Sequence, residues 1–438
     1  MSRARWKSTG FVAAAVMVGM ISGVRADELP RARPEELGFS SAQLDYIDQF
    51  YSEKVKRGEM AGIVTLIARH GKIAHFSAIG YADIEKRHKM ETDTIFRLYS
   101  MTKPIASVAL MMLYEEGRFQ MNDPLSKYIP EFGNLRVLRN PDAPFDETVA
   151  VVHAPTVQDV MRHTAGFTHG LATDAFDAQY TKANVFGLDV SLAEMTSKLA
   201  KIPLRYQPGT KFVYSVGPDI QARLVEVLSG MTFEEFLEKR LFNPLGMKDA
   251  GFWVPADKAS RLATVYWAKD GKLLPLDAAH GHPDRGLLVE PWFVNSYTTK
   301  HKHTGGSFGL VSTTEDYWRF AQMMLNAGQL NGARILSPQV VHFMARDHLG
   351  TIRSSEPNAF LAGVGFGLGF AVMKDPAEAG YMSSEGSFFW AGAANTHFWI
   401  DPKEDMVVVA MTQDMGGAPG AETLWPQIRT LVYSALME

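Results

Sequence analysis

The spacing of apolar residues along the chain predicts helices and strands in separate blocks. Apolar positions recur at helical spacing from residue 44 to 55, and Ser40 or Ser41 can cap that helix. Apolar-rich runs at 63–68 and 73–79 then flank a His-Gly turn, which predicts an antiparallel hairpin. A helix followed by antiparallel strands argues against a doubly wound parallel sheet.

The rest of the chain continues with a helical middle and a mixed last third. A buried helix is predicted that starts at Ser100, with its apolar run beginning at Ile105 and Gly117 as its stop. A polar stretch from 277 to 303 is expected to form long loops. Helical patterns also occur at 220–228, 233–241, 315–325 and 424–436, and strand patterns at 366–372, 388–400 and 406–412. Sheet elements therefore bracket a helical middle. The predicted fold class is α+β, an antiparallel sheet flanked by helices with a helical lobe inserted in the sequence.

The first 26 residues are predicted to be a signal peptide. Three basic residues precede an apolar stretch from 11 to 24, and Val24-Arg25-Ala26 offers small residues at the offsets that signal peptidase needs. We therefore expect a periplasmic or secreted protein with no stable membrane span after cleavage. An uncleaved anchor is the alternative, for which the apolar run is short. The remaining residues, 27–438, are expected to form one catalytic domain, with a sheet lobe at about 27–98 and 300–438 and a mainly helical lobe at about 99–299.

Composition narrows the possible chemistry. The 438 residues include no cysteine, which excludes disulfides, thiol catalysis, thiolate metal sites and a lipoprotein anchor. The formal net charge is -4, and it becomes -8 once the four basic residues of the signal peptide are removed. This negative balance argues against nucleic acid as a partner.

Ser100 and Lys103 form an S-x-x-K tetrad at the mouth of the helix that ends before Gly117. Residues three apart on a helix share a face, so the serine hydroxyl and the lysine amine are expected to lie within reach of each other. The free N–H groups of a helix start also favour developing negative charge. Taken alone the tetrad is weak, because an N-capping serine followed by a solvated lysine gives the same letters.

A lysine that activates a serine must be neutral when it accepts the proton. Lowering its pKa from about 10.4 to about 7 corresponds to roughly 4 to 5 kcal/mol, which burial and a helix start can supply. Tyr214, which follows a Gln-Pro-Gly turn, is a candidate second proton carrier. Its phenol can accept a proton from Ser100 and later donate one to a leaving group.

Several ordered motifs resemble the serine β-lactamase and penicillin-recognising superfamily, particularly class C β-lactamases and family VIII carboxylesterases. The resemblance covers roughly residues 36 to 435. It is carried by Phe96-Arg97 with Ser100-Met101-Thr102-Lys103, His163-Thr164-Ala165-Gly166, Pro208-Gly209-Thr210-Lys211-Phe212-Val213-Tyr214-Ser215, Pro244-Leu245-Gly246-Met247, Gly309-Leu310-Val311-Ser312-Thr313 and Trp390-Ala391-Gly392.

This resemblance implies a β-lactamase/transpeptidase-like fold and a role for each matching residue. Ser100 corresponds to the acylated nucleophile, Lys103 to the base or proton relay, and Tyr214 to its partner. The backbone N–H groups of Ser100 and Ala393 correspond to the oxyanion hole, whose donors stabilise the tetrahedral oxygen.

Two departures from the β-lactamase pattern bear on the substrate. Val216 stands where β-lactamases carry the asparagine of Tyr-x-Asn, and Trp390-Ala391-Gly392 stands where they carry Lys-Thr-Gly. The amide that contacts a lactam side chain and the cation that holds the drug's carboxylate are therefore both absent. The Trp-x-Gly motif resembles that of the family VIII esterases. The substrate is therefore expected to be an uncharged ester, contacted by Val216, Trp390, Ala391 and Gly392. Losing that cation also favours Lys103 over a Tyr214 phenolate as the base.

Two other motifs offer alternatives to this interpretation. Gly305 to Gly309 fits the G-x-S-x-G elbow of α/β-hydrolases, with His342 or His397 as a conceivable partner, but polar residues precede it where the elbow needs an apolar strand. His303-Thr304-Gly305 imitates Lys-Thr-Gly, yet Trp390 begins a strand that is expected to pair with the next, so Trp390 is preferred.

Two further patterns involve histidine and glycine. Alternating glycines from 363 to 369 favour a bulged or closely approached strand over a nucleotide loop. Four histidines expected in loops are the candidates for a metal site: His280, His282, His301 and His303. No H-E-x-x-H motif or carboxylate pattern accompanies them, so no metal and no cofactor is expected.

The sequence therefore predicts an exported serine hydrolase that acts on small-molecule carboxyl esters through an acyl-enzyme on Ser100. A class C-like β-lactamase or a D-alanyl-D-alanine peptidase is the alternative. A non-catalytic binding member of the same fold is a third hypothesis, which the persistence of Ser100, Lys103 and Tyr214 disfavours.

Overall fold

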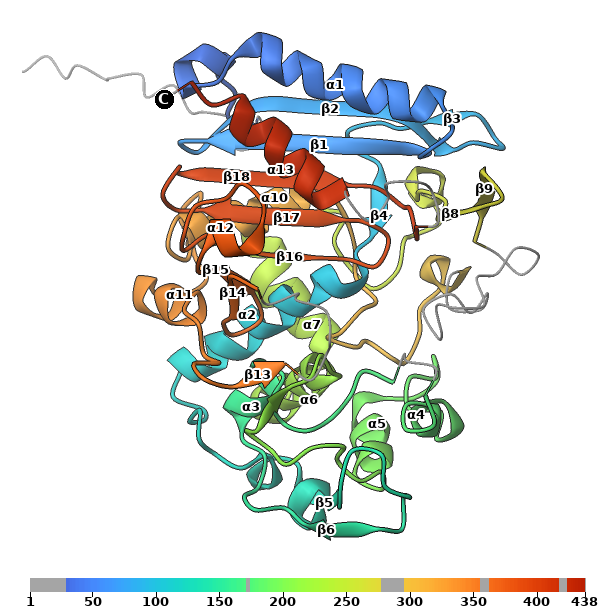
Figure 1. Ribbon diagram of the computed structural model, residues 1–438, viewed down its shortest axis with the longest axis vertical. Helices are drawn as coiled ribbons and strands as arrows, with labels where there is room; N and C mark the ends of the chain where they lie inside the picture. The colour runs from blue at the N-terminus through green and yellow to red at the C-terminus, as the bar shows by residue number, and fades with distance from the viewer. Residues whose placement is uncertain (1–28, 171–173, 277–294, 355–361, 417–423, 438) are drawn as a thin grey trace, which may run out of the picture.

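An eight-stranded antiparallel sheet forms the centre of the computed structural model, which describes residues 29–170, 174–276, 295–354, 362–416 and 424–437 (Figure 1). The strands lie in the order β14-β15-β16-β17-β18-β1-β2-β3. Both ends of the chain contribute, and they meet where β1 pairs with β18. The predicted α+β class is confirmed. The strands are β1 (Gly62–Arg69), β2 (Lys72–Asp83), β3 (His88–Lys89), β14 (Val364–Phe366), β15 (Ala371–Met373), β16 (Phe388–Ala391), β17 (His397–Asp401) and β18 (Met406–Met411).

Helices cover both faces of this sheet. Successive residues of β17 point to opposite faces, so neighbouring side chains of this strand contact different helices. The Trp399 ring stacks on Tyr433 of α13 (Leu424–Ser434) with centroids 6.3 Å apart. Its neighbour Phe398 instead contacts Tyr317 of α10 (Thr314–Leu325), with centroids 4.9 Å apart. Figure 1 shows α13 in front of the sheet, close to α1 (Ser41–Lys56), and α10 behind it.

The elements expected near the N-terminus are confirmed. Ser40 caps α1 by accepting a hydrogen bond from the Gln43 N–H. The β1–β2 hairpin turns at His70-Gly71, where both residues have positive φ. The apolar helix α2 (Thr102–Glu115) is buried over almost its whole length, and Gly117 follows its end with φ of 73°.

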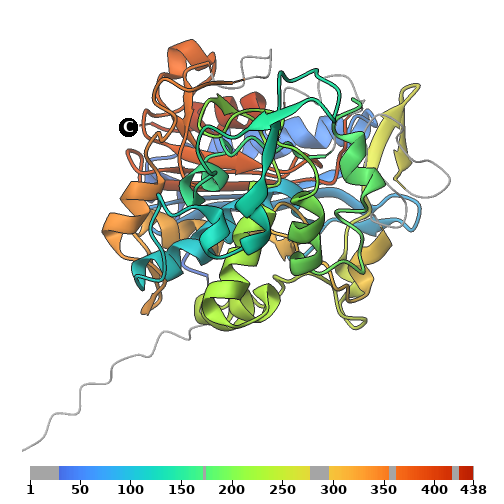
Figure 2. The same cartoon turned by 90° about the horizontal axis from the view of Figure 1, so that it is seen from below.

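The middle of the chain is mainly helical and lies below the sheet, as the view from below in Figure 2 shows. The expected helix at 220–228 is confirmed, and the one at 233–241 continues into a π-helical turn at Glu238–Phe242. The boundaries predicted for the two lobes stay a prediction. The elements here are α3 (Val157–Met161), α4 (Ala178–Lys182), α5 (Leu192–Leu199), α6 (Gly217–Ser229), α7 (Phe233–Leu237), α8 (Asn243–Leu245), and the strand pairs β5 (Arg136–Leu138) with β6 (Thr148–Ala150) and β8 (Tyr266–Lys269) with β9 (Lys272–Pro275).

Two of the predicted strands are hairpins instead. Residues 366–372 run from β14 through a turn into β15, and residues 388–400 run from β16 through a turn into β17. The first turn is buried and apolar, with Leu368 and Phe370 fully buried, so the hydrophobic pattern does not reveal the reversal. Gly369 has φ of 92°, and a Cβ there would lie 2.3 Å from Ser107 Oγ. The close approach expected for the alternating glycines is therefore present, at a turn.

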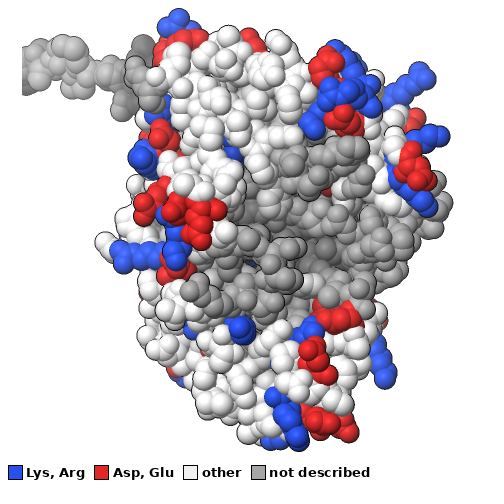
Figure 3. Space-filling view, viewed as in Figure 1, with Lys and Arg blue, Asp and Glu red and all other residues white. Residues whose placement is uncertain are grey.

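Other expectations fall outside the described residues. These include the predicted signal peptide and most of the polar stretch at 277–303. Among the helices that the structure describes, none is long and apolar enough to cross a membrane. On the face shown in Figure 3, acidic and basic side chains are interspersed. The described part of this face therefore has no continuous basic surface to which a polyanion could bind.

Candidate active site

Two short strands outside the main sheet position the chain at the site. β4 (Ile95–Arg97) pairs with β10 (Val311–Thr313), and the Leu98 N–H donates to the Leu310 carbonyl at 2.9 Å. Ser100 follows β4, and the segment Gly305–Leu310 precedes β10. The pairing therefore brings the start of α2 beside a segment about 200 residues further along the chain.

Ser100 lies in a 3-10 turn, Tyr99–Met101, that leads directly into α2. Tyr99 is fully buried with φ of 45°, a strained conformation for a residue with a Cβ. This turn leaves Ser100 half-buried, just before the helix and not inside it. No described residue accepts a hydrogen bond from the Ser100 N–H, so that donor is available to a ligand.

Lys103 lies in the first turn of α2, and its Nζ is 3.1 Å from Ser100 Oγ. The same atom donates to the Ser307 carbonyl at 2.7 Å and lies 4.6 Å from the centre of the Tyr214 ring. Burial lowers the pKa of Lys103 to about 7, although the Asp219 carboxylate acts in the opposite direction. The structure thus brings Ser100 and Lys103 together as their spacing predicts, and a substantial part of the amine is neutral at pH 7.

Tyr214 and Trp390 complete this cluster from two distant segments. The Trp390 Nε1–H donates to the Tyr214 hydroxyl at 3.3 Å, and the two ring centroids lie 5.4 Å apart. Trp390 is paired with Phe398 across β16 and β17, which places its side chain on the α10 side of the sheet. Ser100, Lys103, Tyr214 and Trp390 therefore share one site.

His163 supports Tyr214, although sequence reasoning assigned it no role. The ring centroids of His163 and Tyr214 lie 4.9 Å apart. The His163 Nδ1 accepts from the Ser215 N–H at 3.1 Å and lies 2.9 Å from Ser215 Oγ. Burial holds the pKa of His163 well below its usual value, so the ring is neutral and carries its proton on Nε2. The sequence signal for this residue was the motif His163-Thr164-Ala165-Gly166.

The turn between β16 and β17 contains the other predicted site residues. A Cβ on Gly392 would lie 2.2 Å from Thr396 Oγ1 and 2.3 Å from the Leu98 carbonyl oxygen, so glycine is required there. No described residue accepts a hydrogen bond from the Ala393 N–H. This donor and that of Ser100 are available, and their convergence on one oxyanion stays a prediction.

Val216 and Ala391 are less open to a ligand. Val216 is 1% exposed and belongs to the hydrophobic core, and Ala391 is 6% exposed in β16. The Val216 N–H donates to the Thr168 carbonyl at 3.1 Å, which fixes the start of α6. A contact of either side chain with substrate stays a prediction.

The competing motifs occupy other places. No strand precedes Ser307 in residues 295–306, its Oγ is buried without a hydrogen-bond partner, and its carbonyl contacts Lys103. His303 lies outside any strand and its Nδ1 is 3.2 Å from the Val190 carbonyl, whereas Trp390 lies in β16 beside Tyr214.

The histidines named for a metal site are only partly described. His280 and His282 lie outside the described residues, and His301 Nε2 lies 3.1 Å from Thr299 Oγ1. Among the described side chains, no group of three or more His, Asp and Glu is placed to hold a metal ion.

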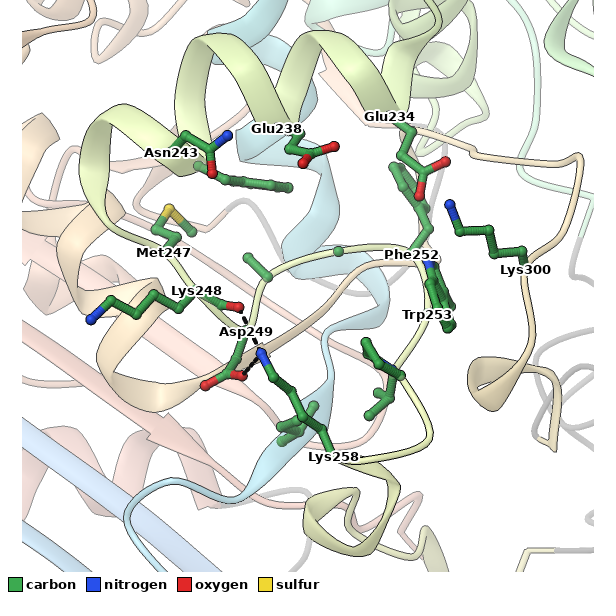
Figure 4. A pocket seen from close by; sticks show the side chains of 16 residues that line it. Glu234, Glu238, Asn243, Met247, Lys248, Asp249, Phe252, Trp253, Lys258 and Lys300 are labelled. Carbon is green, nitrogen blue, oxygen red and sulfur yellow. Dashed lines mark hydrogen bonds and ion pairs between the residues drawn. The ribbon is translucent and has the colours of Figure 1, made fainter.

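A cavity of about 280 Å³ opens elsewhere, between α7 and the segment that follows α8 (Figure 4). Lys300 lies 5.1 Å from the centre of a Trp253 ring and points toward Glu234, while Lys258 Nζ lies 2.8 Å from an Asp249 oxygen. None of the four clustered residues lines this cavity, so the cavity is separate from the candidate site. Those four are Ser100, Lys103, Tyr214 and Trp390.

Comparison with known proteins gives a consistent result. The sequence model of the Beta-lactamase family matches residues 47–433. Protein Rv1367c of Mycobacterium tuberculosis is 33% identical over 364 residues, which cover 81% of this chain and 86% of that protein. Esterase EstB of Burkholderia gladioli is 28% identical over 402 residues, which cover 89% of this chain and 94% of EstB.

The fold has counterparts among solved structures. The structure described as EstCE1, a hydrolase with promiscuous acyltransferase activity, superposes with a TM-score of 0.75 at 24% sequence identity. The superposition covers 90% of this chain and 99% of EstCE1. At this identity the likeness concerns the fold.

Proposed function

Because the chain belongs to the beta-lactamase family of serine hydrolases, we propose that it cleaves carboxyl esters through an acyl-enzyme on Ser100. One observation carries the proposal: Ser100 Oγ lies 3.1 Å from the Nζ of a buried lysine whose pKa is lowered to about 7. A neutral Lys103 offers a lone pair to the serine hydroxyl, and one of its own N–H groups remains on the Ser307 carbonyl at 2.7 Å. Lys103 is therefore the proposed base.

Acylation follows from this geometry. The Ser100 hydroxyl gives its proton to Lys103 as Oγ forms a bond to the ester carbonyl carbon. The resulting oxyanion is held by the N–H groups of Ser100 and Ala393. Collapse of the tetrahedral intermediate breaks the bond to the alcohol oxygen, which leaves with the proton that Lys103 returns, directly or through Tyr214.

Deacylation reverses these roles with water as the nucleophile. Lys103, neutral again, accepts a proton from water as the water oxygen attacks the acyl carbon. Collapse of the second intermediate releases a carboxylic acid and returns the proton to Ser100 Oγ. No cofactor enters the proposed cycle.

The surroundings of Tyr214 favour an ester over a β-lactam. Its hydroxyl faces the neutral indole of Trp390 at 3.3 Å, where a β-lactamase is expected to present a cation to the drug's carboxylate. An uncharged substrate needs no such cation. The esterase name of the Burkholderia gladioli relative supports the same preference at 28% identity.

A β-lactamase or D-alanyl-D-alanine peptidase activity is the second proposal. It uses the same acyl-enzyme chemistry on an amide bond. The test compares the purified protein with Ser100→Ala on p-nitrophenyl butyrate and on a chromogenic cephalosporin. We expect ester turnover that disappears in the variant. Efficient cephalosporin turnover with negligible ester turnover would support the second proposal and contradict the first.

We also propose that the protein is exported. The basic and apolar pattern of residues 1–26 supports this proposal. Cell fractionation of the natural host, together with N-terminal sequencing of the recovered protein, is expected to find it outside the cytoplasm with Asp27 as its first residue. Recovery from the cytoplasm with Met1 intact would contradict it.

A further inference from the structure

Asp219 is a buried carboxylate that contacts the backbone which holds Lys103. It lies in the first turn of α6 and is fully buried. Its Oδ1 accepts from the Ser307 N–H at 2.9 Å, and its Oδ2 has no hydrogen-bond partner. Burying a carboxylate is costly, and an acid that only complements a helix start can stay in water. The burial of Asp219 therefore calls for another reason.

His303 lies close to the same segment of backbone. It is buried, and its Nδ1 lies 3.2 Å from the Val190 carbonyl, which can only accept a hydrogen bond. Nδ1 therefore carries a proton, which leaves Nε2 without a partner. A Cβ built on Gly305 would lie 2.5 Å from Asp219 Oδ1 and 2.7 Å from His303 Nε2. The acid and the imidazole thus both approach Gly305 closely.

The neighbouring glycine shows why the segment runs so close to the helices. A Cβ on Gly306 would lie 2.1 Å from the Pro218 carbonyl oxygen and 3.0 Å from the Ala106 Cβ. The absence of side chains at 305 and 306 therefore lets the segment lie between α2 and the start of α6. The G-x-S-x-G pattern here serves to place the backbone of Ser307, while its hydroxyl stays buried and unpartnered.

We propose that Asp219 and His303 are positioning residues for Lys103. Asp219 holds the N–H of Ser307, so that the carbonyl of the same residue keeps Lys103 Nζ against Ser100 Oγ. Burial raises the pKa of Asp219, and the nearby His303 acts in the opposite direction and favours the ionised carboxylate. The inference rests on the proposed function in one respect, which is that Lys103 acts as the base for Ser100.

Asp219 also influences the charge of Lys103. Burial favours the neutral amine of Lys103, and the Asp219 carboxylate acts in the opposite direction and favours the protonated form. Removing the charge at 219 therefore lowers the pKa of Lys103. Since the neutral amine is the active form, the acid limb of the kcat/KM profile moves to lower pH. The titratable groups around Lys103 are Asp219 of α6, Tyr214 before that helix, and His163 and His169 of the segment after α3, the last paired with Asp177.

The test separates the hydrogen bond of Asp219 from its charge. Asp219→Asn keeps an acceptor for the Ser307 N–H, so we expect kcat within about tenfold of the original and an acid limb moved down by about one pH unit. Asp219→Ala removes the acceptor, so we expect kcat to fall about 100-fold with KM little changed. Asp316→Asn is the matched control, since Asp316 is a buried acid of α10 that contacts the Asp249 N–H instead; its acid limb should not move.

His303 is tested through its dependence on Asp219. His303→Ala should move the acid limb in the same direction as Asp219→Asn, because it raises the pKa of Asp219 and so removes part of its charge. Combining the two changes should add nothing to Asp219→Asn alone. Thermal unfolding of each variant confirms that the folded protein is being assayed.

A second readout keeps this test independent of ester hydrolysis. The rate at which a fluorophosphonate labels Ser100 is measured against pH in the same variants. If esters are not hydrolysed but labelling shows the expected shift, the positioning inference stands and the esterase proposal fails. Folded Asp219→Ala with the original kcat and pH profile would overturn the inference, as would a wild-type protein whose Ser100 is never labelled.

Discussion

The Trp390 indole donates its N–H to the Tyr214 hydroxyl at 3.3 Å. A neutral donor thus occupies the place where β-lactamases are expected to carry a lysine. Because the Tyr214 oxygen is the acceptor in this bond, the phenol keeps its own proton. Tyr214 can therefore act as a phenol that passes a proton, and Lys103 is left as the base.

This relationship predicts unequal effects for two conservative changes. Tyr214→Phe removes the proton carrier, and kcat for an ester should fall about 100-fold or more. Trp390→Phe keeps an aromatic ring against Tyr214 but removes the N–H, so kcat should fall by about tenfold or less. Steady-state kinetics on both variants check this order. A larger loss in Trp390→Phe than in Tyr214→Phe would contradict it.

The pKa of Lys103 predicts the pH dependence of catalysis. Because burial lowers this pKa to about 7 and the neutral amine is the active form, kcat/KM should rise with pH through about 7 and then level off. Lys103→Arg should be inactive throughout, since guanidinium stays protonated. A profile that falls as pH rises through 7 would show that the protonated form is the active one.

The same lysine predicts a stability cost. Its pKa is about 7 in the folded protein and 10.5 ordinarily, so the unfolded chain binds more protons between these values. The free energy of unfolding of the wild type should therefore rise across this pH range. Lys103→Met should be more stable than the wild type at pH 7, by about 2–4 kcal/mol, with a margin that narrows toward pH 10. Urea titrations at several pH values measure it, and a pH-independent margin would argue against a buried titrating amine.

Gly392 predicts a steric effect at the turn that carries Ala393. A Cβ at 392 would collide with Thr396 Oγ1 and the Leu98 carbonyl, at 2.2 and 2.3 Å. Gly392→Ala should lower the unfolding free energy by about 1–3 kcal/mol and reduce kcat, because the turn must shift. Gly133→Ala is the control, since a Cβ there meets no atom closer than 3.9 Å. Equal stability of the two variants would refute the packing argument.

His163 predicts a loss that depends on the replacement. His163→Ala leaves the Ser215 N–H without its acceptor and opens a cavity, so it should cost about 2–4 kcal/mol of unfolding free energy. His163→Asn can supply an acceptor and tolerates the φ of 60°, so its loss should be smaller. Urea unfolding of the two variants distinguishes them, and an alanine variant as stable as the asparagine variant would contradict this account.

Residues near each other in sequence were the most predictable part of the molecule. The helix capped at Ser40, the hairpin at His70 and the contact of Ser100 with Lys103 all follow from local spacing. The two misassigned strands have another cause. The turn at Gly369 is buried against Ser107, so apolar residues continue through it. The turn between β16 and β17 is short and lies between two apolar strands, so the pattern does not separate them.

The residues that support the site could not be predicted, because their contacts join segments that lie far apart in the sequence. Asp219 and His303 lie 84 positions apart in the sequence, and the fold brings both of them close to Gly305. His163 contacts Ser215 across 52 positions. The sequence did contain signals for them, in the His-Thr-Ala-Gly motif and the G-x-S-x-G segment, but chemistry could be assigned to neither motif without its spatial neighbours.

The most direct test of the central claim is the mass of the protein during turnover. After rapid acid quenching of a reaction with p-nitrophenyl butyrate, intact-mass and peptide analysis should find one butyryl group on Ser100, and none in Ser100→Ala. Ester turnover with the acyl group on another residue, or turnover retained in Ser100→Ala, would contradict the account.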